Sequence, residues 1–322
     1  MAMPAKLKPT PITYLLVVIV FLVIILAELL FIYSLNKPKV ISLFPATGSA
    51  YIADPTYTPT TTPTLTDTPT PTPSPIPDKN NFDSGYDYPV TAQAKGTVRI
   101  PVLTYHHINE LPASATQRPY YVTPTMFDRQ MAYLKDKNYR TLSMQEFFDQ
   151  LKSGKNPTQK SVLIIFDDSD ADQYKYAFPT LQKYGFIATF AVISAKSGIT
   201  AAQLREMSAA GMDIESHSKY HEDLAKLDDD GILYDEVTNS RYDLQARVNK
   251  TVIAIIYPGC TADGQAIAHV KSAGYSLGFS CGKTIDNRFS QRYTLNRMHV
   301  YSNFENFKQR LSGIWIVTND YE

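Results

Sequence analysis

The chain from residue 98 onward alternates short apolar runs with stretches that have the punctuation of helices. Several runs end on polar residues, and all are short enough to be single buried strands. The runs are VRIPVLTY, SVLIIFDD, IATFAVI, MDIESH, TVIAIIYP and YSLGFSC. Repeated alternation of strand and helix predicts a parallel sheet, either open or closed into a barrel.

Helix ends are marked between these runs. Ser143 with Glu146, and Thr200 with Gln203, have the spacing of capping boxes. The remaining signals are a Thr123-Pro124 start and the helix-ending glycines Gly185, Gly211 and Gly274. The helices are therefore expected to fill the connections between the strands.

A different pattern precedes this region. Residues 12–34 are almost wholly apolar, broken mainly by Glu28. A stretch of about 20 residues fits a transmembrane helix better than the apolar region of a cleaved signal peptide, and no A-x-A cleavage site follows closely. The sequence predicts a cytoplasmic tail over residues 1–11 and an uncleaved signal anchor over 12–34. A cleaved signal and a secreted protein are the alternative.

Residues 35–97 include the run PTYTPTTTPTLTDTPTPTPSPIP. Too few apolar residues occur there to build a core, so we expect an extended, disordered Thr/Pro-rich linker. Such stalks are typical of surface proteins, which favours an extracytoplasmic position for the domain that follows. Residues 98–322 are long enough for one large single-core domain.

Charge excludes one class of partner. Lys and Arg total 31, as do Asp and Glu, so the formal net charge is near zero. A nucleic-acid-binding domain would need a basic surface. No nucleic-acid partner is predicted.

Polar residues with catalytic potential stand at the ends of the apolar runs. Asp167 and Asp168 end one run, His217 ends another, and Tyr257-Pro258-Gly259 ends a third. The carboxyl ends of parallel strands form the active face of such folds. A single Asp at a strand end is often only a helix N-cap, but convergence of several strands weakens that interpretation.

Asp168, His217 and His221 have the composition of a catalytic metal site. The two histidines are four residues apart, which can place both imidazoles on one side of a helix or tight turn. Two imidazoles and one carboxylate would leave a coordination position open for water. The histidine spacing alone is weak support. Adjacent strand residues point in opposite directions, so Asp167 and Asp168 are not expected to act as a glycosidase pair.

These segments, taken in order, resemble the polysaccharide deacetylases of carbohydrate esterase family 4, and within it the extracellular poly-N-acetylglucosamine deacetylase type. IPVLTYHHI resembles the opening strand of that group, and IIFDDSDADQY its first catalytic motif. GMDIESHSKYHEDL resembles the second motif, and IIYPGC the third in its Tyr-Pro form. The resemblance implies a distorted (β/α)7 TIM-like barrel and a hydrolase that removes N-acetyl groups from a cell-surface or extracellular amino-sugar polysaccharide.

The resemblance also implies roles for individual residues. They are Asp167 as general base, Asp168, His217 and His221 as ligands of a divalent metal, taken as zinc, the Gly259 N–H as oxyanion donor, His299 as general acid, and His106 and Tyr257 as substrate-binding residues. If His299 is not the acid, Asp167 could return its proton to the leaving nitrogen.

The sequence departs from the family pattern at three points. Ser169 replaces a glycine, Ile256 stands where many members have an arginine, and His299 is an uncertain counterpart of the late histidine. Two rival functions therefore stay open: an O-acetyl esterase on the same scaffold, and a catalytically weak carbohydrate-binding protein. Cys260 and Cys281, the only cysteines, could form a disulfide or remain buried thiols.

Overall fold

The computed structural model describes residues 96–113, 115 and 118–313. The predicted signal anchor and nearly all of the predicted linker lie outside these residues. Within the described part of the chain, no helix has both the length and the apolar character needed to cross a membrane.

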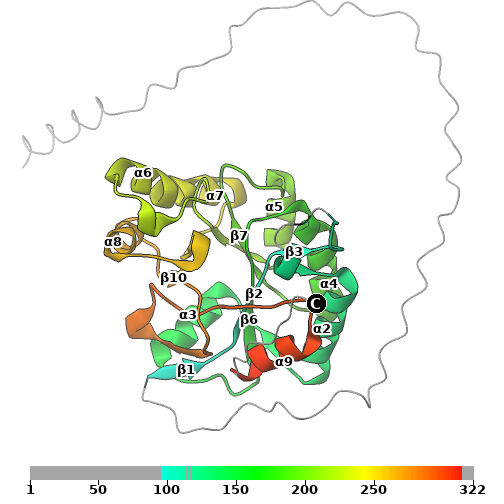
Figure 1. The fold of residues 1–322 in the computed structure, drawn as a ribbon. Coiled ribbons are helices and arrows are strands. Elements are labelled where there is room, and N and C mark those ends of the chain that lie inside the picture. Colours follow the sequence, from blue (N-terminus) through cyan, green and yellow to red (C-terminus); the bar gives the residue numbers. More distant parts are fainter. Residues whose placement is uncertain (1–95, 114, 116–117, 314–322) are drawn as a thin grey trace, which may run out of the picture. The chain divides into compact units, whose positions relative to one another are not determined.

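Parallel strands form the centre of the domain (Figure 1). The strands are β1 Thr97–Arg99, β2 Val102–Tyr105, β3 His107–Ile108, β4 Tyr121–Val122, β5 Arg140–Thr141, β6 Ser161–Phe166, β7 Thr189–Val192, β8 Asp213–Ser216, β9 Ala254–Ile256, β10 Leu277–Phe279, β11 Asp286–Arg288 and β12 Met298–His299. The main sheet has the order β10-β9-β8-β7-β6-β2-β12, with β5 also paired to β6. All of its pairings are parallel, as the alternation predicted.

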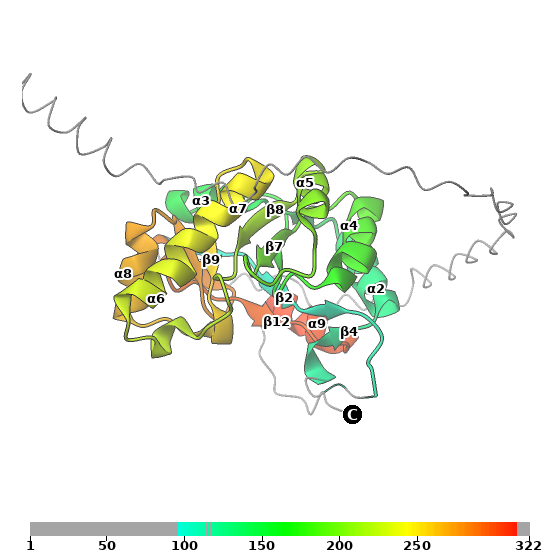
Figure 2. The same cartoon turned by 90° about the horizontal axis from the view of Figure 1, so that it is seen from above.

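Helices surround the strands, as Figure 2 shows from above. They are α2 Pro124–Asp136, α3 Met144–Ser153, α4 Phe178–Tyr184, α5 Ala201–Ala209, α6 Asp230–Tyr234, α7 Ser240–Val248, α8 Gly264–Ser272 and α9 Phe304–Ser312. The predicted helix starts are confirmed: Thr123 caps α2, and capping boxes at Ser143 and Thr200 begin α3 and α5. Local side-chain chemistry therefore decides where these helices begin.

Residues 295–299 close the sheet into a distorted barrel. Leu295 forms a parallel bridge with Phe279 of β10, while Met298 and His299 pair with β2. The same short segment thus contacts both edges of the sheet. This arrangement fits the distorted (β/α)7 barrel expected from the sequence.

Both faces of the sheet are buried, which explains why most of its strands are mainly apolar. Along β6, Ile164 and Phe166 belong to the core beneath the outer helices, whereas Leu163 and Ile165 belong to a second core inside the barrel. Phe147 of α3 joins that inner core. Packing on both faces holds the carboxyl ends of the strands in fixed relative positions.

One predicted strand proved to be two. VRIPVLTY splits into β1 and β2, and β1 leaves the main sheet to pair antiparallel with β11. Pro101 lies between the two strands and has no N–H to donate to a ladder, which accounts for the break.

Candidate active site

The site lies where four parallel strands end. His106 follows β2, Asp167 and Asp168 follow β6, His217 follows β8, and Gly259 lies in the turn after β9. The sequence placed these residues at strand ends, and the sheet order brings the ends together.

Asp167 and Asp168 do not alternate as strand residues would. The strand β6 ends at Phe166, and Asp168 and Ser169 take left-handed φ values of 72° and 57°. As a result both carboxylates reach His217: Asp167 Oδ2 lies 3.9 Å and Asp168 Oδ1 lies 3.3 Å from its Nε2. The opposite orientation expected for two strand residues therefore does not apply.

Ser169 occupies the position where the related motif has glycine. It is fully buried, and its carbonyl accepts a hydrogen bond from the Gly198 N–H at 2.9 Å. A Cβ on Gly198 would lie 2.9 Å from the Ala171 nitrogen, so only glycine permits this close approach. Packing against Gly198 thus supports the left-handed turn despite the side chain at Ser169.

Asp168, His217 and His221 form a group that could hold a metal ion. Their ligand atoms all lie within 4.8 Å of one another, and His221 Nε2 is 3.3 Å from Asp168 Oδ1. His217 Nδ1 lies 2.7 Å from the Ile256 carbonyl oxygen, so Nδ1–H donates there and the Nε2 lone pair faces the site. Asp168 Oδ1 is buried without a hydrogen-bond donor. The residues present therefore fit a divalent cation with an open coordination position.

A tight turn, not a helix, carries the two histidines. Ser218 and His221 have φ values of 61° and 69°. Glu236, which is buried in the π-helical turn Asp235–Asn239, accepts the backbone N–H groups of Lys219 and Tyr220 at 3.0 Å each. Glu236 thereby fixes the turn that positions His221, and no local pattern around Glu236 predicts this contact.

Asp167 lies beside the Asp168–His217–His221 group in a position suited to a base. Burial opposes its ionisation, but nearby positive charge, that of Arg297 foremost, outweighs burial and lowers the pKa of its carboxyl. Oδ2 pairs with Arg297 Nη1, whereas Oδ1 has no hydrogen-bond partner. The carboxylate is therefore ionised, and its Oδ1 is free to accept a proton.

Arg297 is the functional residue that sequence reasoning missed. It is buried and pairs with Asp167, while its Nη2 donates to the Tyr257 carbonyl oxygen at 3.0 Å. The arginine absent at Ile256 is thus replaced by a guanidinium from the strand that closes the barrel. The available signal was an arginine two residues before His299 in a strand-like run, which puts both on one face.

Tyr257 requires a correction. Its side chain is fully buried, and its hydroxyl donates to the Tyr293 carbonyl oxygen at 3.0 Å. The ring is therefore not available to a substrate, contrary to the predicted substrate contact. Tyr257 contributes to the site through its backbone, by accepting the hydrogen bond from Arg297.

His106 and His299 lie together on the far side of Asp167. His106 Nε2 is 3.7 Å from Asp167 Oδ2, and the two imidazole rings are 5.2 Å apart. Tyr120 stacks on His106 at 4.4 Å. Burial and the neighbouring charges lower the pKa of His299 to about 3, and burial lowers the pKa of His106. His299 thus has the predicted position but is neutral near pH 7.

Cys260 and Cys281 form a disulfide, with their Cα atoms 4.9 Å apart. The bond resolves the alternative that the sequence left open. It links the turn after β9 with the loop after β10, at the rim of the site.

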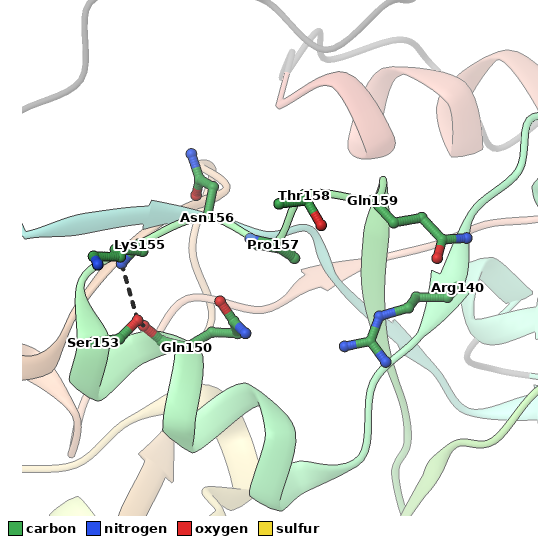
Figure 3. A pocket seen from close by; sticks show the side chains of 8 residues that line it. All are labelled: Arg140, Gln150, Ser153, Lys155, Asn156, Pro157, Thr158 and Gln159. Atoms are coloured by element: carbon green, nitrogen blue, oxygen red, sulfur yellow. Dashed lines mark hydrogen bonds between the residues drawn. The ribbon is translucent and has the colours of Figure 1, made fainter.

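A separate polar pocket lies away from this site (Figure 3). It has a volume of about 570 Å³ and is lined by residues that include Arg140, Gln150 and Lys155. The pocket adjoins the amino end of β6, whereas Asp167 follows its carboxyl end. It therefore belongs to the opposite end of the barrel from Asp167 and the Asp168–His217–His221 group.

The fold and the site together define a class: a barrel hydrolase with an Asp–His–His group beside a buried carboxylate. Comparison with known proteins agrees. The polysaccharide deacetylase family profile matches residues 154–278. YxkH of Bacillus subtilis, named for that family, is 30% identical over 206 residues, covering 63% of this chain and 71% of YxkH.

Two further relatives agree with this assignment. The poly-β-1,6-N-acetyl-D-glucosamine N-deacetylase of Staphylococcus aureus strain MRSA252 is 26% identical and covers 66% of this chain and 82% of its own. PplD, a Streptococcus pyogenes deacetylase solved in complex with acetate, is 30% identical with a TM-score of 0.62, covering 66% of this chain and 97% of its own. The chain belongs to the polysaccharide deacetylase family and is a hydrolase of carbon–nitrogen bonds other than peptide bonds.

Proposed function

We propose that this protein is a metal-dependent deacetylase that hydrolyses N-acetyl groups of an N-acetylglucosamine polymer. The observation that carries the proposal is the Asp168–His217–His221 group beside the free Oδ1 of Asp167. The Staphylococcus aureus relative is named for such a polymer and supports the choice of substrate.

Asp168, His217 and His221 would hold the cation, for which we propose zinc because imidazole and carboxylate ligands suit it. When bound, a divalent cation polarises a carbonyl and lowers the pKa of a water molecule. Asp167 Oδ1 accepts the proton of the attacking water. The Gly259 N–H donates to the acetyl oxygen as negative charge develops there.

The leaving nitrogen must gain a proton before the C–N bond breaks. His299 is neutral in the free protein because its pKa is about 3, so it does not carry that proton at the start. Asp167 acquires a proton during the attack and can return it to the nitrogen. We therefore favour Asp167 as both base and acid, with His299 accepting a hydrogen bond within the site.

The test is release of acetate by the full chain from poly-N-acetylglucosamine, with Asp167→Asn as the diagnostic variant. Loss of a general base lowers turnover by about 10²–10⁴-fold. Asp149→Asn, an exposed position on α3, is the matched control. Parent-like turnover in Asp167→Asn would remove Asp167 from the mechanism. Release from acetylated xylan but not from the amino-sugar polymer would instead indicate an O-acetyl esterase.

We also propose that the domain lies outside the cell on an N-terminal anchor. The apolar run at residues 12–34, the Thr/Pro-rich segment after it and the disulfide all support this location, because disulfides persist in oxidising compartments.

A further inference from the structure

The Cys260–Cys281 disulfide contacts two side chains of the candidate site directly. Cys260 Sγ lies 3.9 Å from Arg297 Nη2, and Cys281 Sγ lies 3.9 Å from His299 Nε2. One sulfur atom therefore packs against Arg297, which pairs with Asp167, and the other packs against His299.

The bond is not needed to align the strands that it connects. Backbone pairing already joins β9 to β10 as far as Ile256 and Phe279, and the Tyr257 N–H donates to the Phe279 carbonyl oxygen at 3.0 Å. Cys260 and Cys281 lie beyond that last ladder bond. What the disulfide fixes is the pair of loops at the rim.

One of those loops holds the proposed oxyanion donor. Gly259 and Cys260 have left-handed φ values of 64° and 69°. Glycine adopts this conformation readily, but cysteine does so rarely. The link to Cys281 restrains Cys260, and with it the turn that contains the Gly259 N–H.

We propose that the disulfide is a positioning element of the active site, which makes deacetylation conditional on oxidation of Cys260 and Cys281. The inference rests on the proposed function. In the reduced chain, the Gly259 N–H, Arg297 and His299 lose their common support, while the Asp168–His217–His221 group, held by other elements, stays intact. Turnover should fall far more than metal binding or substrate affinity.

Reduction with a water-soluble phosphine tests this inference cleanly. The S–S bond breaks, each sulfur becomes a thiol, and water supplies the oxygen as the phosphine becomes its oxide. The chain has only these two cysteines, so the reagent has no other disulfide to reduce. We expect kcat to fall by about tenfold or more, because misplacing a catalytic group by about 1 Å can cost up to about 10²-fold, with KM and zinc content nearly unchanged.

The double variant Cys260→Ser/Cys281→Ser is the matched control. It should have the low kcat of the reduced parent and should not respond to the phosphine. A further loss of activity in this variant would show that the reagent acts on the metal, and would overturn the interpretation. If the variant does not fold, reduction of the folded parent below its melting temperature still gives the comparison.

Hydrogen exchange supplies a measurement that does not depend on activity. Reduction should speed exchange over residues 257–260 and 280–282, and leave β6 and β8 unchanged. Equal exchange in both redox states would overturn the proposal even if activity fell. Absence of acetate release from the oxidised parent would refute the proposed function, whereas the exchange experiment would still decide the role of the disulfide.

Discussion

Replacing Arg297 with Met should reverse the way in which the contribution of Asp167 to folding stability changes with pH. In the parent, Arg297 helps to hold the pKa of Asp167 below its ordinary value, and both side chains are buried. Ionised Asp167 therefore contributes stability above the unfolded pKa of about 3.9, and this contribution is lost as the pH falls through the lower folded value. Methionine removes the charge and leaves burial dominant, so the folded pKa should rise.

The size of the effect follows from the burial of the pair. Removing one partner of a buried ion pair typically costs about 3–5 kcal/mol. At about 1.4 kcal/mol per pKa unit, this corresponds to a rise of about 2–4 units. His106 cannot replace the lost charge near neutrality, because burial lowers its pKa. Loss of the hydrogen bond to the Tyr257 carbonyl adds about 1 kcal/mol at every pH.

Urea unfolding from about pH 4 to about pH 8, with a chelator present, tests the prediction. This range covers the pH values at which Asp167 should be ionised in the folded parent but protonated in folded Arg297→Met. The free energy gap between parent and Arg297→Met should be small at the acidic end and widen toward neutral pH. Turnover of the variant should also recover partly at alkaline pH, as Asp167 ionises. Arg297→Lys keeps the charge and should show a smaller gap. A gap that does not change with pH would refute the reasoning.

Two further predictions concern the metal and the location of the domain. His221→Ala should lose most bound zinc, and Glu236→Ala should weaken zinc binding by about 10-fold or more because the 219–220 turn loses its hydrogen bonds to Glu236. Elemental analysis after dialysis measures both effects, with Asp149→Ala as the control. Parental zinc content in His221→Ala would contradict the ligand assignment. Protease added to intact cells should remove the domain from residue 98 onward. If the same protease cleaves the domain in lysed cells but leaves it intact in whole cells, the proposed exterior location is contradicted.

The sequence determined the strands and the helix starts because each depends on local chemistry. Mainly apolar runs marked the strands β6, β7, β9 and β10, and capping residues such as Ser143 and Thr200 marked helix starts. Strand-end placement also brought Asp167, Asp168 and His217 into one expected site, because parallel strands all end at the same rim.

Only the tertiary structure decided how those residues face one another. Left-handed backbone at Asp168 and Ser169 turns both carboxylates toward His217, a conformation that a strand pattern cannot reveal. Arg297 reaches Asp167 across 130 residues of chain, and Glu236 supports the histidine turn across 16 or 17. Such contacts depend on closure of the barrel and on packing between elements, and neither leaves a periodic pattern along the chain.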